Sequence, residues 1–426
     1  MKRGNNPYFL FLIVILIFVN TQANDVIRCG TVEAFNKHVI KNPNALPHKQ
    51  QLETRISQWI SANTQQKESA AAALITIPVV VHVVYNTDEQ NISDAQINSQ
   101  ISKLNLDFNN TNADRLLSTH PFFSITGNAS IQFCLAGRDP NGNSTNGITR
   151  TNTSVVSFSD DDKVKFTADG GKDAWDATQY LNIWVCNLGG SLLGYAQFPS
   201  DLNLFPETDG VVITYNSFGT TGAVNPPFDL GRTTTHEIGH WLGLEHIWGD
   251  DEGTVNECSG SDNVDDTPNQ QVSTTGCPNT AITDNCSAVS PGINYQNFMD
   301  YTDDACMVMF TNGQVSRMLA VLDNSRLSIK SSNKCSGTTS IITQTNASIK
   351  VFPNPVQNYL MIEGLPKSGN RMYTVEFFNS IGQKIHSLQV NANRAEIEMN
   401  ELETGIYVML IYNEDFSFNH KISVLK

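Results

Sequence analysis

The stretch His236-Glu-Ile-Gly-His240-Trp-Leu-Gly243-Leu-Glu-His246 has the pattern H-E-x-x-H-x-x-G-x-x-H, which indicates both the fold and the chemistry of this chain. His236 and His240 are four residues apart, so on a helix both imidazoles project from one face and can bind one metal ion. Glu237 is placed to act as a base on a water molecule at that metal. Gly243 lets the chain turn out of the helix, which brings His246 round as a third ligand. Three neutral imidazoles with a fourth tetrahedral position open are typical of a catalytic zinc site; the alternative is a helix whose histidines have this spacing by chance.

The motif resembles the zinc signature of the metzincin metalloproteases, which carry a methionine turn further along the chain. The stretch Asn297-Phe-Met-Asp-Tyr301 resembles that turn. The sequence from Met299 to Met318, Trp241 after the second histidine, and Asp265-Asp-Thr-Pro268 are most similar to the pappalysin branch, the M43 peptidases of cytophagalysin and ulilysin type. The resemblance covers roughly residues 74–330.

The resemblance implies an α+β catalytic domain over residues 74–335, with a mixed sheet, helices, zinc in a cleft and a lower subdomain held by disulfides. It implies a zinc endopeptidase that is made as a zymogen and binds peptide substrates in extended form. Met299 would be a packing platform beneath the zinc, and the Tyr301 hydroxyl would stabilise the oxyanion. Asp303 and Asp304 lie where such enzymes shape the pocket for the residue after the cut. An acidic pocket there would favour Arg or Lys.

The residue pattern predicts the main elements of this domain. Residues 75–85 are β-branched and predict a buried strand, and Ser93 opens a helix that continues to Phe108. Further strands are expected at 131–136, 181–187 and 210–215, the zinc helix at 231–243, and a capped helix from Thr311. Residues 190–197 are the candidate edge strand for substrate binding, unless they form an ordinary hairpin.

The chain has eight cysteines, and four of them lie between the zinc motif and the end of the methionine turn. Spacing alone allows three pairings of these four. The resemblance implies Cys258–Cys286 and Cys277–Cys306. Cys134 and Cys186 lie on predicted strands and are either buried thiols or part of a third bridge; the sequence does not place Cys335.

Oxygen ligands are concentrated in the loop after the zinc motif. Asp265, Asp266 and Thr267 are the candidate ligands of a structural calcium ion, which pappalysin-type enzymes hold around this segment. The alternative is a set of solvated acids on a surface loop.

Residues 1–23 have the pattern of a signal peptide, with Lys2 and Arg3 before an apolar run. That run is short for a transmembrane anchor, which is the alternative. Residues 24–73 are polar, contain one expected helix near 50–62, and are interpreted as a pro-segment. Cys29 can bind the zinc in the latent form as a cysteine switch, or it can pair in a disulfide.

Residues 336–347 are interpreted as a linker, and residues 348–426 alternate as the short strands of a small β-sandwich. This sandwich resembles the type A sorting domain of the type IX secretion system. The resemblance implies export to the cell surface or outside, with the secretion machinery as a partner. The alternative is a substrate-binding sandwich.

Composition agrees with an extracellular protein. The net charge is −15 and the pI is near 5.0, and the sequence has no long basic run, so a nucleic-acid partner is not expected. Two function classes remain, a secreted zinc endopeptidase and a non-catalytic surface adhesin that keeps the fold. The presence of Glu237 with all three histidines favours the enzyme.

Overall fold

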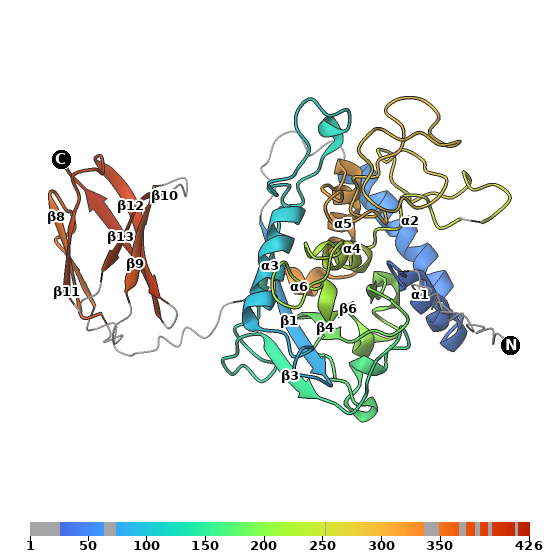
Figure 1. Ribbon diagram of the computed structural model, residues 1–426, viewed down its shortest axis with the longest axis horizontal. Coiled ribbons are helices and arrows are strands. Elements are labelled where there is room, and N and C mark those ends of the chain that lie inside the picture. The colour runs from blue at the N-terminus through green and yellow to red at the C-terminus, as the bar shows by residue number, and fades with distance from the viewer. Residues whose placement is uncertain are drawn as a thin grey trace, which may run out of the picture. The chain divides into compact units, whose positions relative to one another are not determined.

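The chain forms two units, each with its own core. The computed structural model describes residues 26–63, 74–251, 253–335, 349–365, 372–379, 384–390, 394–413 and 416–426. Residues up to 337 belong to the larger unit, and residues from 338 onward belong to the smaller one (Figure 1). The expected signal peptide, 1–23, and linker, 336–347, lie outside the described residues.

The larger unit is built on a mixed sheet of six strands in which only the last strand is antiparallel. Its central strand β1, Ile75–Tyr85, is the buried run expected from the sequence and pairs in parallel with β2, β3 and β4. β4 pairs in parallel with β6, and β5 then forms the antiparallel edge. The bounds are β2 Ile131–Leu135, β3 Ile148–Asn152, β4 Leu181–Cys186, β5 Gly194–Ala196 and β6 Val211–Thr214. An edge strand of this kind can accept an extended peptide.

Two helices of the larger unit begin at the caps that the sequence predicts. Ser93 caps α3, Asp94–Phe108, by accepting from the Gln96 amide, and Thr311 and Gln314 form a complete capping box at α5, Asn312–Asn324. α4, Arg232–Trp241, is buried along its whole length, and α6, Leu327–Lys330, follows α5. Short 3-10 turns lie at Phe123–Ile125, Lys163–Lys165, Thr167–Asp169, Pro199–Asp201, Pro206–Thr208 and Tyr215–Ser217.

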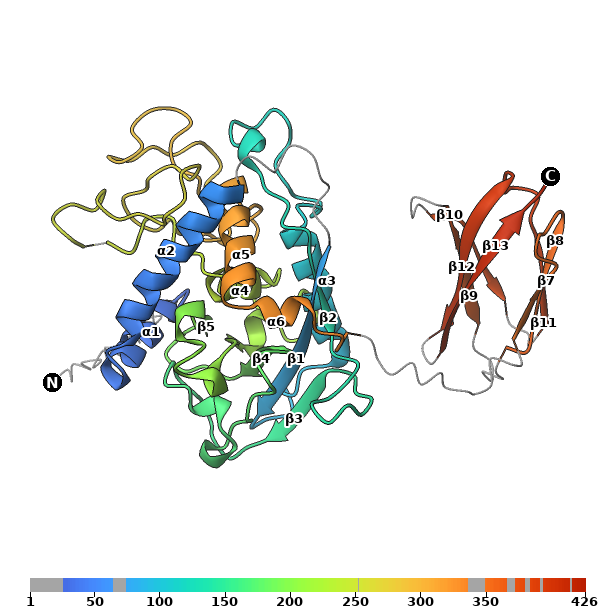
Figure 2. The same cartoon turned by 180° about the vertical axis from the view of Figure 1, so that it is seen from behind.

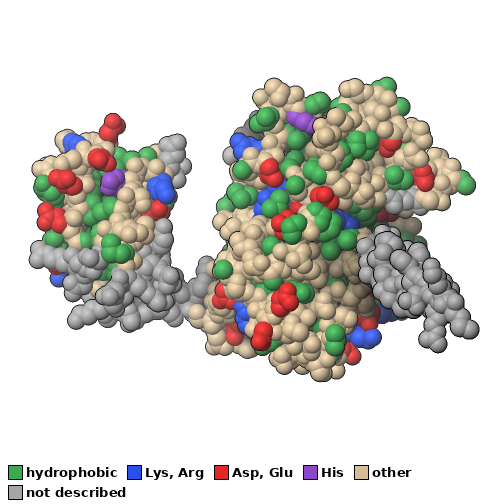
Figure 3. Space-filling model, in the orientation of Figure 1, with side chains coloured by type: hydrophobic (Ala, Val, Ile, Leu, Met, Phe, Trp, Pro, Cys, Tyr) green, Lys and Arg blue, Asp and Glu red, His purple; other side chains and the backbone are tan. Residues whose placement is uncertain are grey.

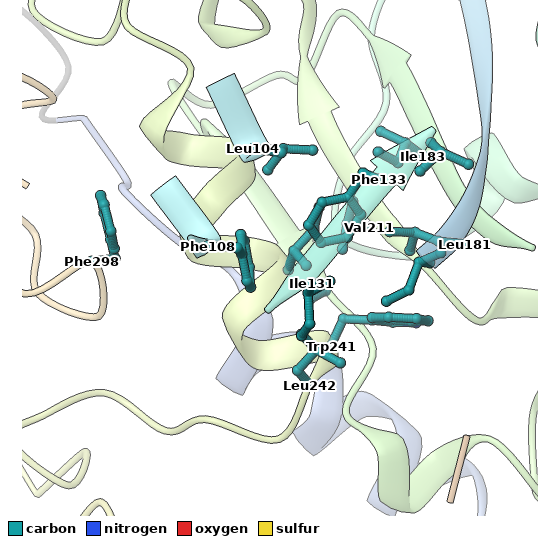
Figure 4. Close-up of a cluster of buried hydrophobic side chains, with 14 of the residues drawn as sticks. Leu104, Phe108, Ile131, Phe133, Leu181, Ile183, Val211, Trp241, Leu242 and Phe298 are labelled. Atoms are coloured by element: carbon teal, nitrogen blue, oxygen red, sulfur yellow. The ribbon is translucent and has the colours of Figure 1, made fainter. Parts of the chain in front are cut away.

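The core of this unit lies between the sheet and helices α3 and α4 (Figure 4). Side chains from strands β2, β4 and β6 meet Leu104 and Phe108 of α3 and Trp241 of α4 there. Burying a side chain of this size stabilises the fold by about 1.5–3 kcal/mol. The core therefore holds the zinc helix rigidly against the sheet.

Two helices precede the sheet; the first packs against its edge strand β5, and the second packs against helix α5. They are α1, Thr31–Lys41, which the sequence did not predict, and α2, Ala45–Asn63, which begins before the expected 50–62 because Pro47 fits its first turn. α2 lies beside α5 (Figure 2), where Leu52 and Ile56 pack against Ala320 and Val321. The pro-segment therefore folds with the larger unit.

Three disulfides fix the loops. The structure contains both pairs that the resemblance implies, Cys258–Cys286 and Cys277–Cys306. The third pair, Cys134–Cys335, answers the question that the sequence left open for Cys134 and Cys335. Among the described cysteines, Cys29 and Cys186 are free and buried.

The smaller unit consists of two antiparallel sheets that share one apolar core. The first sheet has the order β10-β9-β12-β13, and the second has the order β11-β8-β7. The bounds are β7 Lys350–Phe352, β8 Tyr359–Glu363, β9 Tyr373–Phe378, β10 Lys384–Val390, β11 Arg394–Glu398, β12 Gly405–Asn413 and β13 Phe416–Val424. This is the small β-sandwich expected from the alternating pattern.

Candidate active site

Helix α4 and the turn after it carry the three histidines of the zinc motif. Gly243 follows the helix with φ +84°, and a Cβ atom at this position would lie 2.7 Å from Cγ2 of Val321. Both the backbone conformation and the packing therefore require glycine there. The turn carries His246 back to His236 and His240, so local geometry rather than long-range folding assembles the site.

Each histidine is oriented by a hydrogen bond that its Nδ1–H group donates. The acceptors are the Phe298 carbonyl at 2.7 Å, the Leu244 carbonyl at 2.8 Å and Asp250 Oδ1 at 2.5 Å, for His236, His240 and His246 respectively. Because Nδ1–H donates to these oxygens, the Nε2 lone pairs are directed at one another. His240 Nε2 lies 3.1 Å from Nε2 of each of the other two histidines.

This arrangement fits a cation. Three lone pairs facing one another at such distances repel unless a positive charge lies between them. Cys29 completes the group, and the donor atoms of all four residues lie within 4.8 Å of one another. Three nitrogens and one sulfur around a point are a donor set that zinc prefers. Burial lowers the pKa of His236 and His240, which keeps their imidazoles neutral; burial acts likewise on His246, but Asp250 outweighs it and raises that pKa.

Glu237 lies next to this centre and is fully buried. Its Oε2 accepts a hydrogen bond from the Thr31 hydroxyl at 2.8 Å and lies 3.5 Å from the Cys29 sulfur. Its Oε1 has no hydrogen-bond partner within the described part of the chain. Burial raises the pKa of Glu237 to about 7, a value suited to a group that takes up and returns a proton near neutral pH.

The methionine turn forms the floor and one wall of the site. Met299 is buried, and a Cβ atom on Gly239 in the zinc helix would lie 2.5 Å from the Met299 sulfur, so the thioether packs directly beneath the helix. The Tyr301 ring centroid lies 4.9 Å from the His246 ring and 4.7 Å from the Trp248 ring. Burial raises the pKa of the Tyr301 phenol, which therefore stays protonated and able to donate.

Comparisons with known proteins agree with this geometry. Residues 165–323 match the family model described as pregnancy-associated plasma protein-A, a peptidase M43 family, and residues 350–425 match a secretion system C-terminal sorting domain. An extracellular metalloprotease of Arthroderma benhamiae is 31% identical over 280 residues, which span 64% of this chain and 81% of that protein. The chain belongs to the pappalysin family of metalloproteases.

Two solved structures of related proteins are also similar to this chain. Mature mirolysin of Tannerella forsythia in complex with a cleaved peptide is 55% identical, covers 62% of this chain and 98% of its own, and has a TM-score of 0.60. A mutant of promirolysin from the same organism is 51% identical, covers 71% of this chain and 96% of its own, and has a TM-score of 0.62.

This pappalysin is a secreted zinc metalloendopeptidase that is made as a zymogen and carries a type IX sorting domain. The relatives do not favour the alternative of a surface adhesin. Among the described residues, no helix has the length and apolarity needed to cross a membrane.

The two acidic residues past the methionine turn have different surroundings. Asp304 is buried, and its Oδ2 accepts from the backbone amides of Leu230 at 2.9 Å and Arg232 at 3.1 Å, at the start of the zinc helix. Its Oδ1 faces the cleft. Asp303 is only partly buried, and its backbone forms a turn with Cys306. Of the two candidates, only Asp304 presents a carboxylate oxygen to the site.

The pro-segment of this pappalysin occupies the cleft. Arg28 Nη2 lies 2.9 Å from Asp304 Oδ1, and its guanidinium also contacts Thr233 and stacks over the Phe228 ring at 4.4 Å. Arg28 and Thr31 were not predicted from the sequence to be functional residues. One signal was available for Arg28, a basic residue directly before Cys29 in a chain expected to have an acidic pocket.

The pro-segment also bonds to the edge of the sheet. The Gly30 amide donates to the Gly194 carbonyl at 2.9 Å, and the Leu193 amide donates to the Ile27 carbonyl at 3.0 Å. Ile27 pairs with Leu192 in parallel. The expected edge strand is therefore present, and residues 27–30 lie along it.

The candidate calcium ligands do not converge. Asp265 is exposed, Asp266 Oδ2 accepts from the Gly313 amide at the start of α5, and the Thr267 hydroxyl donates to Asp262 at 2.7 Å. Within the described ranges, the cluster around the three histidines is the single group of metal-binding side chains.

Proposed function

We propose that this pappalysin cleaves extended peptides before arginine or lysine, and that residues 24–73 keep it latent until they are removed. The observation that carries the proposal is the ion pair between Arg28 and Asp304, both buried and 2.9 Å apart. A buried carboxylate requires a cationic partner, because an unpaired charge away from water is costly. Once Arg28 leaves, the side chain of a basic substrate residue satisfies the same carboxylate.

The residues around the metal supply the rest of the chemistry. His236, His240 and His246 would hold the zinc ion, which when bound acts as a Lewis acid and lowers the pKa of a water molecule. Glu237 takes the proton of the attacking water and passes it to the leaving amine. The Tyr301 hydroxyl donates a hydrogen bond to the carbonyl oxygen as it gains negative charge.

Substrate binding uses the edge strand β5. Its backbone groups pair with an extended peptide once the pro-segment no longer occupies them. This pairing aligns the scissile carbonyl with Glu237, which lies against Gly194: a Cβ atom on that glycine would be 3.0 Å from the Glu237 side chain. Gly194 therefore keeps the strand close to the catalytic carboxylate.

Latency results from three neighbouring residues that disable three parts of the site. The Cys29 sulfur completes the donor set of the metal. The Thr31 hydroxyl occupies one oxygen of Glu237. Arg28 fills the pocket at Asp304. The zymogen thus has its metal position, its base and its specificity pocket blocked at once.

The test compares peptides that differ only in the residue after the cut, using enzyme activated from the full chain. We expect Arg and Lys to be cleaved fastest. An Asp304→Asn variant keeps an oxygen for the helix amides but loses the charge, and should lose about 30-fold or more in kcat/KM for Arg while changing little for Leu. Asp303→Asn is the matched control and should keep the preference.

Glu237→Ala tests the mechanism itself and should be inactive, while the wild type is active and sensitive to chelators. A wild-type enzyme that cleaves Arg and Leu peptides equally well would refute the specificity. Equal cleavage by wild type and Glu237→Ala would refute the zinc mechanism.

A separate part of the proposal is that the 262–267 loop binds structural calcium, which would have to draw together Asp265, Asp266 and Thr267, because these side chains do not converge without it. Oδ1 of Asp266 is buried without a hydrogen-bond partner in the described part of the chain, and burial raises the pKa of Asp262 to about 7. A calcium ion would supply both carboxylates with a counter-charge. Calcium should then raise the melting temperature of the full chain, and equal melting with calcium and with magnesium would argue against a dedicated site.

The domain boundaries complete the proposal: a signal peptide at 1–23, a pro-segment at 24–73, the protease at 74–335, a linker at 336–347 and the sorting domain at 348–426. The two-unit division near residue 337 supports the last boundary. N-terminal sequencing of secreted and activated material tests the first two.

A further inference from the structure

Helix α1 of the pro-segment covers a surface of the catalytic unit that is distinct from the metal centre and from the Asp304 pocket. The buried face of α1 consists of Thr31, Ala34, Phe35 and His38. Ala34 packs with Phe158, Leu188 and Leu192, whereas Phe35 packs with Phe198. When the pro-segment is removed, these apolar side chains of the catalytic unit become exposed.

Carboxylates surround this apolar surface, and each one is paired with a basic residue of α1. Lys37 Nζ lies 2.6 Å from Asp160 Oδ2. His38 is buried, and its Nδ1 and Nε2 lie 2.7 Å and 2.8 Å from carboxylate oxygens of Asp201 and Asp162 respectively.

A histidine with a carboxylate at each ring nitrogen donates from both, which requires the imidazolium form. Burial lowers the pKa of His38, but the two carboxylates outweigh burial and raise it. Other charged groups here are Lys165, which pairs with Asp162 at 2.8 Å, and Lys49, whose Nζ lies over the Phe35 and Phe198 rings. The neighbouring cavity is also lined by Glu33, Asp161, Lys163 and Asp169. The surface thus recognises positive charge on an apolar helix.

The position of α1 indicates which part of a substrate would meet this surface. Arg28 fills the proposed pocket for the residue after the cut, Cys29 lies at the metal, and α1 begins at Thr31. Helix α1 therefore lies on the side of the residues that precede the cut. A cavity of about 660 Å³ adjoins this surface and is lined by Gly30 and Glu33 of the pro-segment and by Asp160 and Leu192.

We propose that the surface under α1, formed by Asp160, Asp162, Asp201, Leu192 and Phe198, is a binding site for a cationic amphipathic helix that precedes the scissile bond in a protein substrate. The inference rests on the proposed function, because it requires that the pro-segment leaves and that Asp304 accepts the residue after the cut. In the pro-segment the residue in the Asp304 pocket precedes α1, whereas in a substrate the helix would precede the residue in that pocket. The two chains therefore run through the site in opposite directions. Recognition therefore depends on an apolar face flanked by basic residues and not on the order of residues in α1.

The test uses three peptides with the same cleavage segment, containing one arginine after the cut. One has no extension, and two have the same twelve-residue amphipathic helix before the segment, with lysine in one and glutamate in the other at the polar positions. For the enzyme activated from the full chain, we expect a KM roughly tenfold lower for the lysine helix than for the glutamate helix, with similar kcat. Equal KM values for the two would overturn the proposal.

Substitutions separate a specific site from the general attraction of an acidic protein. Asp160→Asn should reduce the lysine-over-glutamate preference about threefold, the effect of one exposed ion pair. Asp139→Asn is the matched control, because it removes the same charge from a loop outside this cavity, where the carboxylate bonds to Asn143; it should keep the preference. Equal loss in both variants would mean a diffuse charge effect and would overturn the site.

The peptide without an extension distinguishes a failure of the proposed function from a failure of the helix-binding site. If the wild type does not cleave it before arginine, the proposed function is wrong. If the wild type cleaves it normally and the helices make no difference, only the helix-binding site is wrong.

Discussion

His82 in the central strand gives a quantitative prediction about acid stability. Its side chain is fully buried, with Nε2 3.0 Å from Asn182 Oδ1 and Nδ1 2.8 Å from the Thr149 hydroxyl. Asn182 Oδ1 also accepts from the Trp175 amide at 2.7 Å, so this oxygen is an acceptor and His82 Nε2 carries the proton. Burial lowers the pKa of His82 to about 4, and the imidazole is neutral in the folded protein.

The direction in which the free energy of unfolding changes with pH follows from proton uptake on unfolding. Between pH 6.5 and pH 4 the unfolded chain protonates His82 and the folded chain does not, so the free energy of unfolding falls as the pH falls. At 1.36 kcal/mol per unit of pKa difference, the loss from pH 7.5 to pH 4.5 is about 2.5 kcal/mol from this one residue. The loss is complete only below pH 4.

Urea unfolding of the full chain measures this effect, with tryptophan fluorescence as the signal. All five tryptophans belong to the larger unit, so the smaller unit does not contribute. A His82→Gln variant is expected to be less stable at pH 7.5 but to lose about 2.5 kcal/mol less than the wild type on acidification. Parallel loss of stability in the two proteins would refute a neutral buried His82.

Three further predictions concern the active site. Asp250→Asn should weaken zinc binding about 10–100-fold, because Asp250 orients His246 through its Nδ1 atom; competition with a chelator measures this. Gly243→Ala should destabilise the protein by more than about 1 kcal/mol in thermal melting, since φ is +84° and the Cβ would meet Val321. Thr31→Val should raise the residual activity of the uncleaved zymogen by freeing Glu237, with Thr31→Ser as the control that keeps the hydroxyl. Unchanged activity in Thr31→Val would show that Cys29 and Arg28 impose latency without Thr31.

The sequence predicted elements whose signals are local. β1, α3, α4 and α5 follow from apolar periodicity and from capping residues such as Ser93 and Thr311, and the structure has all four. The three histidines could be predicted to converge because a helix and one glycine turn suffice to assemble them. The α+β fold was also correct, because the resemblance to metzincins implied it.

Features that depend on distant contacts could not be predicted. α1 has only 11 residues, too few for a stable isolated helix, and its docking through Phe35 and His38 depends on partners far along the chain, Phe198 and Asp201. β3 is half exposed and pairs with a strand far earlier in the chain. The Cys134–Cys335 disulfide joins residues 201 positions apart, and cysteine spacing does not predict a pairing over such a separation.

The buried charges of the cleft connect the basic residues of the pro-segment with the proposed preference for basic substrates. Asp304 and Asp201 have fully buried side chains in the zymogen, and each is paired there with a cation from the pro-segment, Arg28 or His38. Removing a cation without replacing it leaves a carboxylate with poor solvation, which costs several kcal/mol if the site stays dry. Activation therefore raises the free energy of the empty cleft, and a ligand that restores the positive charge recovers part of that energy. The same carboxylates that stabilise the latent form thus select cationic chains in the active one, so neutralising Asp304 should weaken pro-segment binding and Arg selectivity together.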